Sequence, residues 1–128
     1  MKIGKELVAA SAVPLVLAIL TDGESYGYAI IQRVRELSQG ALEWSDGMLY
    51  PVLHWLEKNG FVRAHWRVAE SGRKRKYYRI TASGRAQLAE ERRQWEAVDT
   101  TLRNVWQALF RPIAAGDLAT VVPSTTGG

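Results

Sequence analysis

RAHWRVAESGRKRKYYR, residues 63–79, is the segment that decides how this chain is interpreted. It holds seven Arg or Lys residues and one acid, Glu70, a local charge of +6 in a chain whose formal net charge is +4. The other residues therefore sum to −2, so the basic character belongs to this segment. Concentrated positive charge is typical of a surface that meets a polyanion, although a solvated surface hairpin explains charge alone equally well.

The same segment has the pattern of a β-hairpin with one apolar face. Apolar and polar residues alternate over 62–67, a turn is expected at 70–72, and a second run covers 76–80. Because successive strand residues point to opposite faces, at least one of Tyr77 and Tyr78 is expected in the core. The residues expected on the apolar face of the first strand are Val62, Ala64 and Trp66.

Three helices are predicted before the hairpin. The first covers the apolar run 7–20, in which Pro14 either kinks the helix or starts a new one. Ser25 is a suitable N-cap for the second helix, and the third begins near Ser45. The expected apolar stripes are Tyr28, Ile30, Ile31, Val34 and Leu37 on the second helix and Leu49, Val52, Leu53 and Leu56 on the third.

Thr81 has the side chain of an N-cap for a last, longer helix that Pro112 stops. Three short helices followed by a basic hairpin is the element order of a winged helix-turn-helix, in which the third helix enters the major groove. The predicted fold class is therefore mainly α (α+β). We expect a winged helix-turn-helix DNA-binding domain over 5–81, a C-terminal dimerisation helix over 82–111 and a disordered tail over 112–128.

The composition narrows the classes of function. A chain of 128 residues without cysteine is expected to form one domain without disulfides or thiolate chemistry. The apolar run 7–20 is shorter than the roughly 20 residues of a membrane span and lacks a cleavage site, so we expect a cytoplasmic protein with no membrane contact. His54 and His65 fit no zinc spacing and no glycine-rich phosphate loop is present, so no enzyme, metal or cofactor is expected.

Three motifs in register resemble the PadR family of transcriptional regulators. They are SYGYAI (25–30), LYPVL with LEKNGFV (49–53 and 56–62) and GRKRKYYRITASG (72–84). The resemblance is to the phenolic acid- and multidrug-responsive type with a single C-terminal helix, and it implies a ligand-responsive repressor that binds operator DNA as a homodimer. Trp55 departs from the pattern, because family members usually carry Arg or Lys there, which leaves a phosphate contact missing.

Charge and helix position indicate the DNA contacts. The cations expected to bind phosphates at the hairpin tip are Arg73, Lys74, Arg75 and Lys76. The residues expected to face base edges from the third helix are Ser45, Met48, Tyr50 and His54. Candidate backbone contacts from the second helix are Tyr26 and Gln32.

The last helix has apolar residues at heptad spacing. They are Leu88, Trp95, Leu102 and Leu109 in one row and Val98 and Val105 in the other. A helix this long cannot bury such a seam on its own small domain, so a homodimer is expected. A two-fold dimer also suits palindromic half-sites. The alternative is that part of this helix packs on the first helix, 7–20. By the resemblance, paired tryptophans line a cavity at the dimer interface, and a planar aromatic effector would contact Leu7, Ala10, Pro14, Trp95 and Asp99. A filled aromatic core is the alternative to that cavity.

Two other functions fit the same residues. A winged helix can serve as a protein-interaction module, although such a module has no need for seven cations on one hairpin. A small-molecule-binding dimer without operator binding is suggested by Trp55 in place of a cation.

Overall fold

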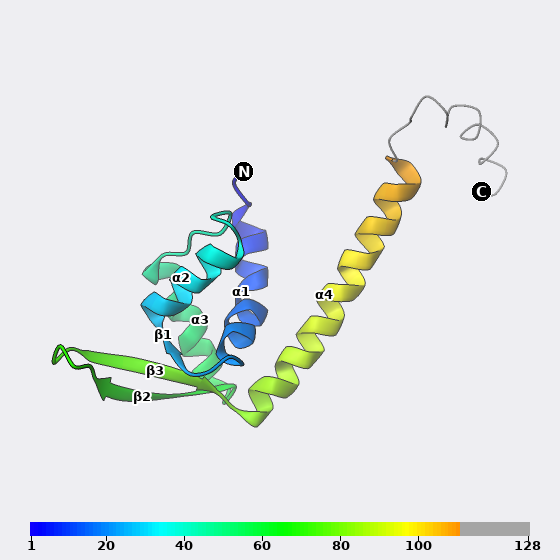
Figure 1. Ribbon diagram of the computed structural model, residues 1–128. Helices are drawn as coiled ribbons and strands as arrows, with labels where there is room; N and C mark the ends of the chain where they lie inside the picture. Colours follow the sequence, from blue (N-terminus) through cyan, green and yellow to red (C-terminus); the bar gives the residue numbers. More distant parts are fainter. Residues whose placement is uncertain (111–128) are drawn as a thin grey trace, which may run out of the picture. The chain divides into compact units, whose positions relative to one another are not determined.

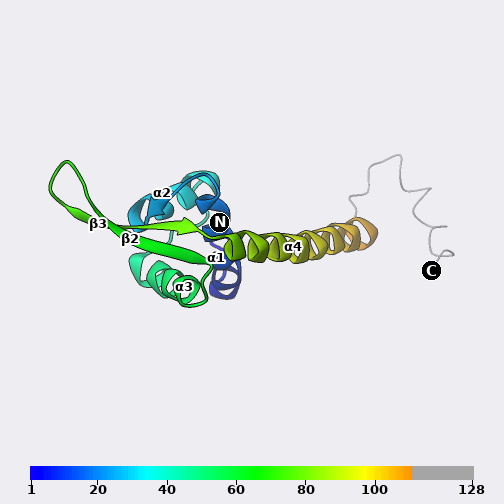
Figure 2. The same ribbon diagram turned by 90° about the horizontal axis from the view of Figure 1, so that it is seen from below.

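A computed structural model describes residues 1–110 of the protein (Figure 1). The chain divides into two units, Met1–Arg93 and Gln94–Gly128. In the first unit, three helices stand on one side of a three-stranded sheet, whose strands lie in front of them when seen from below (Figures 1 and 2). The helices are α1 (Lys5–Leu20), α2 (Gly27–Leu37) and α3 (Asp46–Lys58), and the strands are β1 (Ser25–Tyr26), β2 (Val62–Val68) and β3 (Lys74–Ile80).

The sheet has the order β1-β3-β2 and is antiparallel throughout. β2 and β3 pair along their whole length, from Val62 opposite Ile80 to Val68 opposite Lys74, which confirms the predicted hairpin. The prediction of Ser25 as a helix N-cap is wrong, because Ser25 pairs with Tyr78 in the sheet and Tyr26 precedes the first turn of α2. A strand of two residues is too short to show an alternating pattern.

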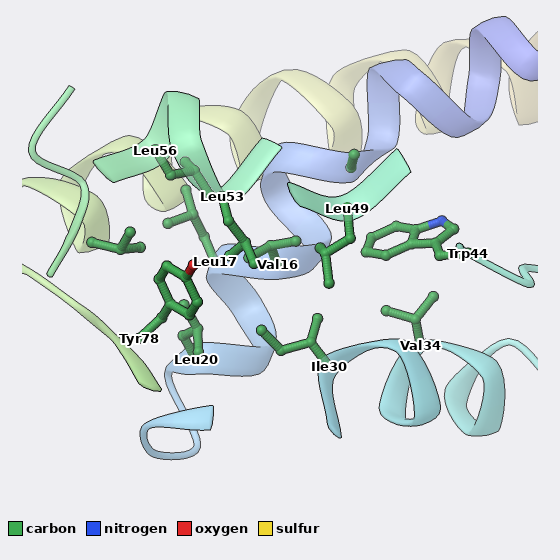
Figure 3. Packing of buried hydrophobic residues seen from close by; sticks show 12 residues of the cluster. Val16, Leu17, Leu20, Ile30, Val34, Trp44, Leu49, Leu53, Leu56 and Tyr78 are labelled. Atoms are coloured by element: carbon green, nitrogen blue, oxygen red, sulfur yellow. The ribbon is translucent and has the colours of Figure 1, made fainter. Parts of the chain in front are cut away.

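The hydrophobic core lies between the three helices and the sheet (Figure 3). Its buried members are Ala12, Val16, Leu17, Leu20, Ile30, Val34, Trp44, Leu49, Leu53, Leu56, Val62 and Tyr78. The α3 stripe and the burial of Tyr78 are thus confirmed. The α2 stripe is narrower than predicted, since Tyr28 and Leu37 are exposed and only Ile30 and Val34, one turn apart, lie fully inside.

Helix ends follow the predicted capping chemistry in two places. Ser45 Oγ accepts a hydrogen bond from the backbone N–H of Met48 at 3.2 Å, and Thr81 Oγ1 accepts one from the N–H of Gly84 at 3.0 Å. Both hydroxyls satisfy donors that have no partner inside the helix. Around Pro14 the chain remains one helix from Lys5 to Leu20, so no new helix begins there.

The start of α4 (Ala82–Leu109) is fixed against the end of α3. The hydroxyls of Thr81 and Ser83 both donate to the carbonyl oxygen of Gly60, at 2.6 and 2.8 Å. A side chain at Gly84 would collide with the carbonyl oxygen of Phe61 and would lie 2.8 Å from Ile80 Cγ1. Glycine is therefore required at this close approach.

α4 continues from the first unit into the second. Leu88, predicted to lie in the dimer seam, packs against the core of the first unit. In the second unit the seam residues Val98, Leu102, Val105 and Leu109 are all exposed. Pro112 and the predicted disordered tail, 112–128, lie outside the described residues. Within residues 1–110 no helix is both long and apolar enough to cross a membrane.

Candidate nucleic-acid interface

The wing, residues 62–80, carries cations on both of its faces. Val62 and Tyr78 are buried, so the side they share faces the helices, and Lys76 lies on that side opposite Trp66. On the other side, Arg63 lies opposite Arg79. The alternation predicted from the sequence is confirmed along the strands, but the apolar face ends before Trp66, which is 66% exposed.

Lys76 is bound to α3. Its ammonium nitrogen lies 3.3 Å from Glu57 Oε1 and 5.6 Å from the centre of the Tyr78 ring. Burial raises the pKa of the Tyr78 phenol, and the charge of Lys76 opposes this rise. The Lys76 side chain therefore holds the wing to α3 instead of projecting from the tip.

Two arginines are also held by the protein. The Arg75 guanidinium stacks over the Tyr26 ring at 4.5 Å, and Tyr26 in turn meets Tyr77 edge-on with ring centres 5.3 Å apart. On the same face, Arg67 pairs with Glu24 at 2.7 Å and lies 4.8 Å from the centre of the Tyr77 ring. These contacts orient the two guanidinium groups before any ligand arrives.

The remaining wing cations have no ion-pair partner among residues 1–110. They are Arg63, Arg73, Lys74 and Arg79. Arg73 and Lys74 lie at the tip, where an external anion can reach them. Arg63 and Arg79 are like charges directly opposite each other on adjacent strands, an arrangement that costs stability unless an anion lies between them.

A cavity of about 430 Å³ lies between the wing and the starts of α2 and α3. Its lining combines aromatic rings with the tip cations and includes one acid: Tyr26, Gly27, Tyr28, Asp46, Tyr50, Trp66, Arg73, Lys74, Arg75 and Lys76. Tyr50 reaches across to α2 because Gly27 has no side chain; a Cβ there would lie 2.9 Å from the tyrosine oxygen. The cavity thus joins the predicted wing residues to the start of the predicted recognition helix.

The exposed side of α3 carries most of the residues predicted to face DNA bases. Tyr50 and His54 are exposed, and so is Ser45, whose hydroxyl oxygen is used in capping. The expected exposure of Met48 is wrong: its side chain is half-buried and packs against the core beside the leucine stripe. Trp55 is 45% exposed, and its ring meets Phe61 with centres 5.8 Å apart.

Two aromatic side chains of this cavity are not among the predicted site residues. The sequence predicts Tyr28 in the buried stripe of α2 and Trp66 on the apolar face of the wing, but they are 65% and 66% exposed. The position of Trp66 among cations was a signal that it faces solvent. The predicted backbone contacts Tyr26 and Gln32 are both half-buried, and Tyr26 lies in the cavity wall.

The predicted effector residues fall in two units. Leu7 and Ala10 are exposed and Pro14 is half-buried on α1, in the first unit. Trp95 is half-buried in the second unit, where Asp99 pairs with Arg103 at 3.0 Å. A cavity shared by these two groups stays a prediction.

A family model described as "Transcriptional regulator PadR-like family" matches residues 16–90 of this chain. The chain belongs to the PadR-like family. A transcriptional regulator of Mycobacterium tuberculosis, Rv3488, is 44% identical over 75 residues, which cover 59% of this chain and 66% of the relative. The range matched by the family model, 16–90, contains the whole wing and the cavity lining.

Solved structures agree with this assignment. A transcriptional regulator from Clostridium thermocellum has a TM-score of 0.72 and 26% identity, covering 80% of this chain and 96% of its own. A PadR-like regulator from Bacillus cereus has a TM-score of 0.70 and 29% identity, covering 80% and 98%. The predicted winged-helix fold and PadR membership are confirmed, and PadR-like proteins are DNA-binding regulators rather than enzymes.

Proposed function

We propose that this PadR-like protein is a ligand-responsive repressor that binds palindromic operator DNA as a homodimer in the cytoplasm. α3 enters the major groove, and the wing contacts the phosphates beside it. The observation that carries the proposal is the cavity between α3 and the wing, where Arg73 and Lys74 have no ion-pair partner among the described residues. Unpaired cations facing an aromatic-lined groove suit a sugar–phosphate backbone.

The residues divide by role. Arg73 and Lys74 bind phosphates directly, and Arg75 does so from the position that Tyr26 gives it. Tyr50 and His54 meet base edges, and the Ser45 hydroxyl can still donate a hydrogen bond while its oxygen caps α3. We leave Met48 out of the base-reading set because it packs inward, and we add Tyr28 and Trp66 as cavity-wall contacts.

Dimerisation is proposed through the apolar seam of α4. Trp95, Val98, Leu102, Val105 and Leu109 recur at three- and four-residue spacing, and the last four are exposed. Burying such side chains against a second copy stabilises the assembly by roughly 1.5–3 kcal/mol each when fully covered. The effector, a planar aromatic molecule, would contact Leu7, Ala10, Pro14, Trp95 and Asp99 at this interface.

The test is binding to a duplex from the protein's own promoter and to a scrambled duplex, each titrated with salt. We expect a preference for the promoter that persists at physiological salt. The double variant Arg73→Glu/Arg75→Glu should lose this binding, whereas the charge-matched control Lys5→Glu/Arg85→Glu should keep it. Equal binding of both duplexes would mean that the wing binds polyanions without sequence preference. No binding to either duplex would favour a protein-interaction module.

A further inference from the structure

β2 has a free edge. It is the outer strand of the sheet (Figure 2), and no strand among residues 1–110 pairs with the side that faces away from β3. The N–H of Thr81 donates to the Phe61 carbonyl oxygen at 3.0 Å and that of Ala69 to the Arg73 carbonyl oxygen at 2.8 Å, so both pairs continue the β2–β3 ladder. Bonded pairs in an antiparallel ladder alternate with pairs whose backbone groups point outward. Because residues 61 and 69 bond to β3, the even-numbered residues of β2 direct their N–H and C=O groups to the free edge.

Three of these residues leave the edge open to a partner. Within the described part of the chain, no loop, helix end or side chain bonds to the backbone of Ala64, Trp66 or Val68. The side chains of Trp66 and Val68 are 66% and 67% exposed. A row of free N–H and C=O groups is a template for a further strand, and the exposed tryptophan and valine add apolar surface beside it.

The charges along β2 select the kind of strand that can pair with it. Its sequence, VRAHWRV, contains two arginines and no acid. Arg67 and His65 already contact Glu24, at 2.7 and 3.3 Å, whereas Arg63, opposite Arg79, has no ion-pair partner among residues 1–110. A second copy of β2 at this edge would place like charges side by side, which disfavours self-association through the edge. An acidic strand would instead compensate the charge of Arg63.

We propose that the free edge of β2 binds an extended acidic segment of another protein, which adds a strand to the sheet. Opposite residues on neighbouring strands share a face, so the segment carries an acid opposite Arg63 and apolar residues opposite Trp66 and Val68. The alternating N–H and C=O groups favour a peptide over a nucleic acid, because a sugar–phosphate backbone of DNA accepts hydrogen bonds but has no donor for the carbonyl groups. This interaction goes beyond operator binding and does not depend on it.

The experiment is a titration of the full chain, without DNA, with a peptide of alternating Glu and Val that has blocked ends and the same length as β2. Exchange of each backbone amide hydrogen with solvent is followed by NMR. We expect the amides of Ala64, Trp66 and Val68 to become protected about tenfold as the peptide saturates the edge. The amides of Arg63 and Arg67 already bond to β3 and should change little. A peptide of alternating Lys and Val should protect none of them.

Matched changes separate backbone pairing from attraction between charges. The Glu–Val peptide N-methylated at every residue keeps its charge but cannot donate to β2, so it should bind about tenfold more weakly. Val68→Pro removes one edge-facing N–H and no bond to β3, and it should weaken binding about fivefold, whereas Val68→Thr keeps the N–H and should bind normally. Arg63→Ala should weaken binding about threefold, and Arg85→Ala, at an exposed position on α4, should not.

The proposal is overturned if the peptide leaves the three edge amides unprotected, if the N-methylated peptide binds equally well, or if Val68→Pro and Val68→Thr bind alike. Protection of these amides before any peptide is added would also overturn it, because the chain itself or a second copy would then occupy the edge. Protection by a DNA duplex instead of the peptide would assign the edge to nucleic acid. Failure of operator binding would leave the result unchanged, since the titration contains no DNA.

Discussion

The ammonium nitrogen of Lys76 lies 3.3 Å from Oε1 of Glu57, so an ion pair joins the wing to α3. Both side chains are about one-third exposed, and pairs of this kind contribute at most about 1 kcal/mol to stability. The main effect of the pair is on position. It sets the wing against α3, the helix proposed to enter the major groove, and it occupies one of the four cations predicted to bind phosphate.

The neighbours Lys74 and Lys76 should therefore differ in their effect on DNA binding. Lys74→Ala should make the negative slope of log affinity against log salt shallower by about 0.9 per subunit, because one phosphate contact is lost. Lys76→Ala should change that slope less, since its ammonium is already paired with Glu57. The measurement is a salt titration of operator affinity for both variants, and equal slope changes would show that Lys76 leaves Glu57 for a phosphate.

Gly84→Ala should destabilise the protein by about 1–3 kcal/mol, the usual cost of overpacking. The added methyl group would collide with the Phe61 carbonyl oxygen and crowd Ile80. Urea denaturation measures the effect. Gly47→Ala is the matched control, because a Cβ there would meet only Ser45 Oγ, at 3.9 Å. A Gly84→Ala variant as stable as the control would contradict the observed packing.

Leu102→Glu should convert the proposed dimer into a monomer. Leu102 lies in the middle of the exposed α4 seam, where a carboxylate would face its own mate across a two-fold axis. Sedimentation at micromolar concentration should change from about twice the 14.3 kDa chain mass to that mass itself. Thr100→Glu adds the same charge outside the seam and should remain dimeric; a dimeric Leu102→Glu variant would place the interface elsewhere.

Alkaline pH should destabilise the fold partly through Tyr78. Burial raises the pKa of its phenol above the ordinary value of about 10, so the folded state holds the neutral form. The corresponding stabilisation is present below about pH 10 and is lost as the pH rises through the folded-state pKa. The free energy of unfolding of Tyr78→Phe should thus fall less between roughly pH 9 and 11 than that of the unaltered protein. Parallel decreases in urea denaturation would refute this role.

The elements with strong local patterns could be predicted from the sequence. Alternation along 62–67, the turn at 70–72 and the leucine stripe of α3 each repeat a pattern that only one secondary structure fits. The caps at Ser45 and Thr81 each join a side chain to a donor three residues later, so they too could be predicted.

The remaining features depend on contacts between distant segments. Ser25 joins the sheet because β3 offers a free edge, and Lys76 turns toward Glu57, 19 residues earlier in the chain. The position of Tyr28 in the helical repeat predicts an inward-facing side chain. The buried face of α2 is narrower than the repeat predicts, so Tyr28 is exposed. Trp44 Nε1 is buried without a hydrogen-bond partner among residues 1–110, and this could not be predicted either, because it depends on the positions of all its neighbours.

The contacts of Arg67, Arg75 and Lys76 inside the protein have a consequence for the proposed binding of DNA by the wing. Each of these side chains is held by a carboxylate or an aromatic ring before binding, so ordering it adds little to the entropy lost on association. A stiff wing would bind a groove of matching width and lose binding free energy in a wider or narrower groove. A flexible wing would adapt to either. In the proposed DNA complex, such a hairpin would select duplexes by the width of their groove, and stretches of DNA that no side chain touches would still influence affinity.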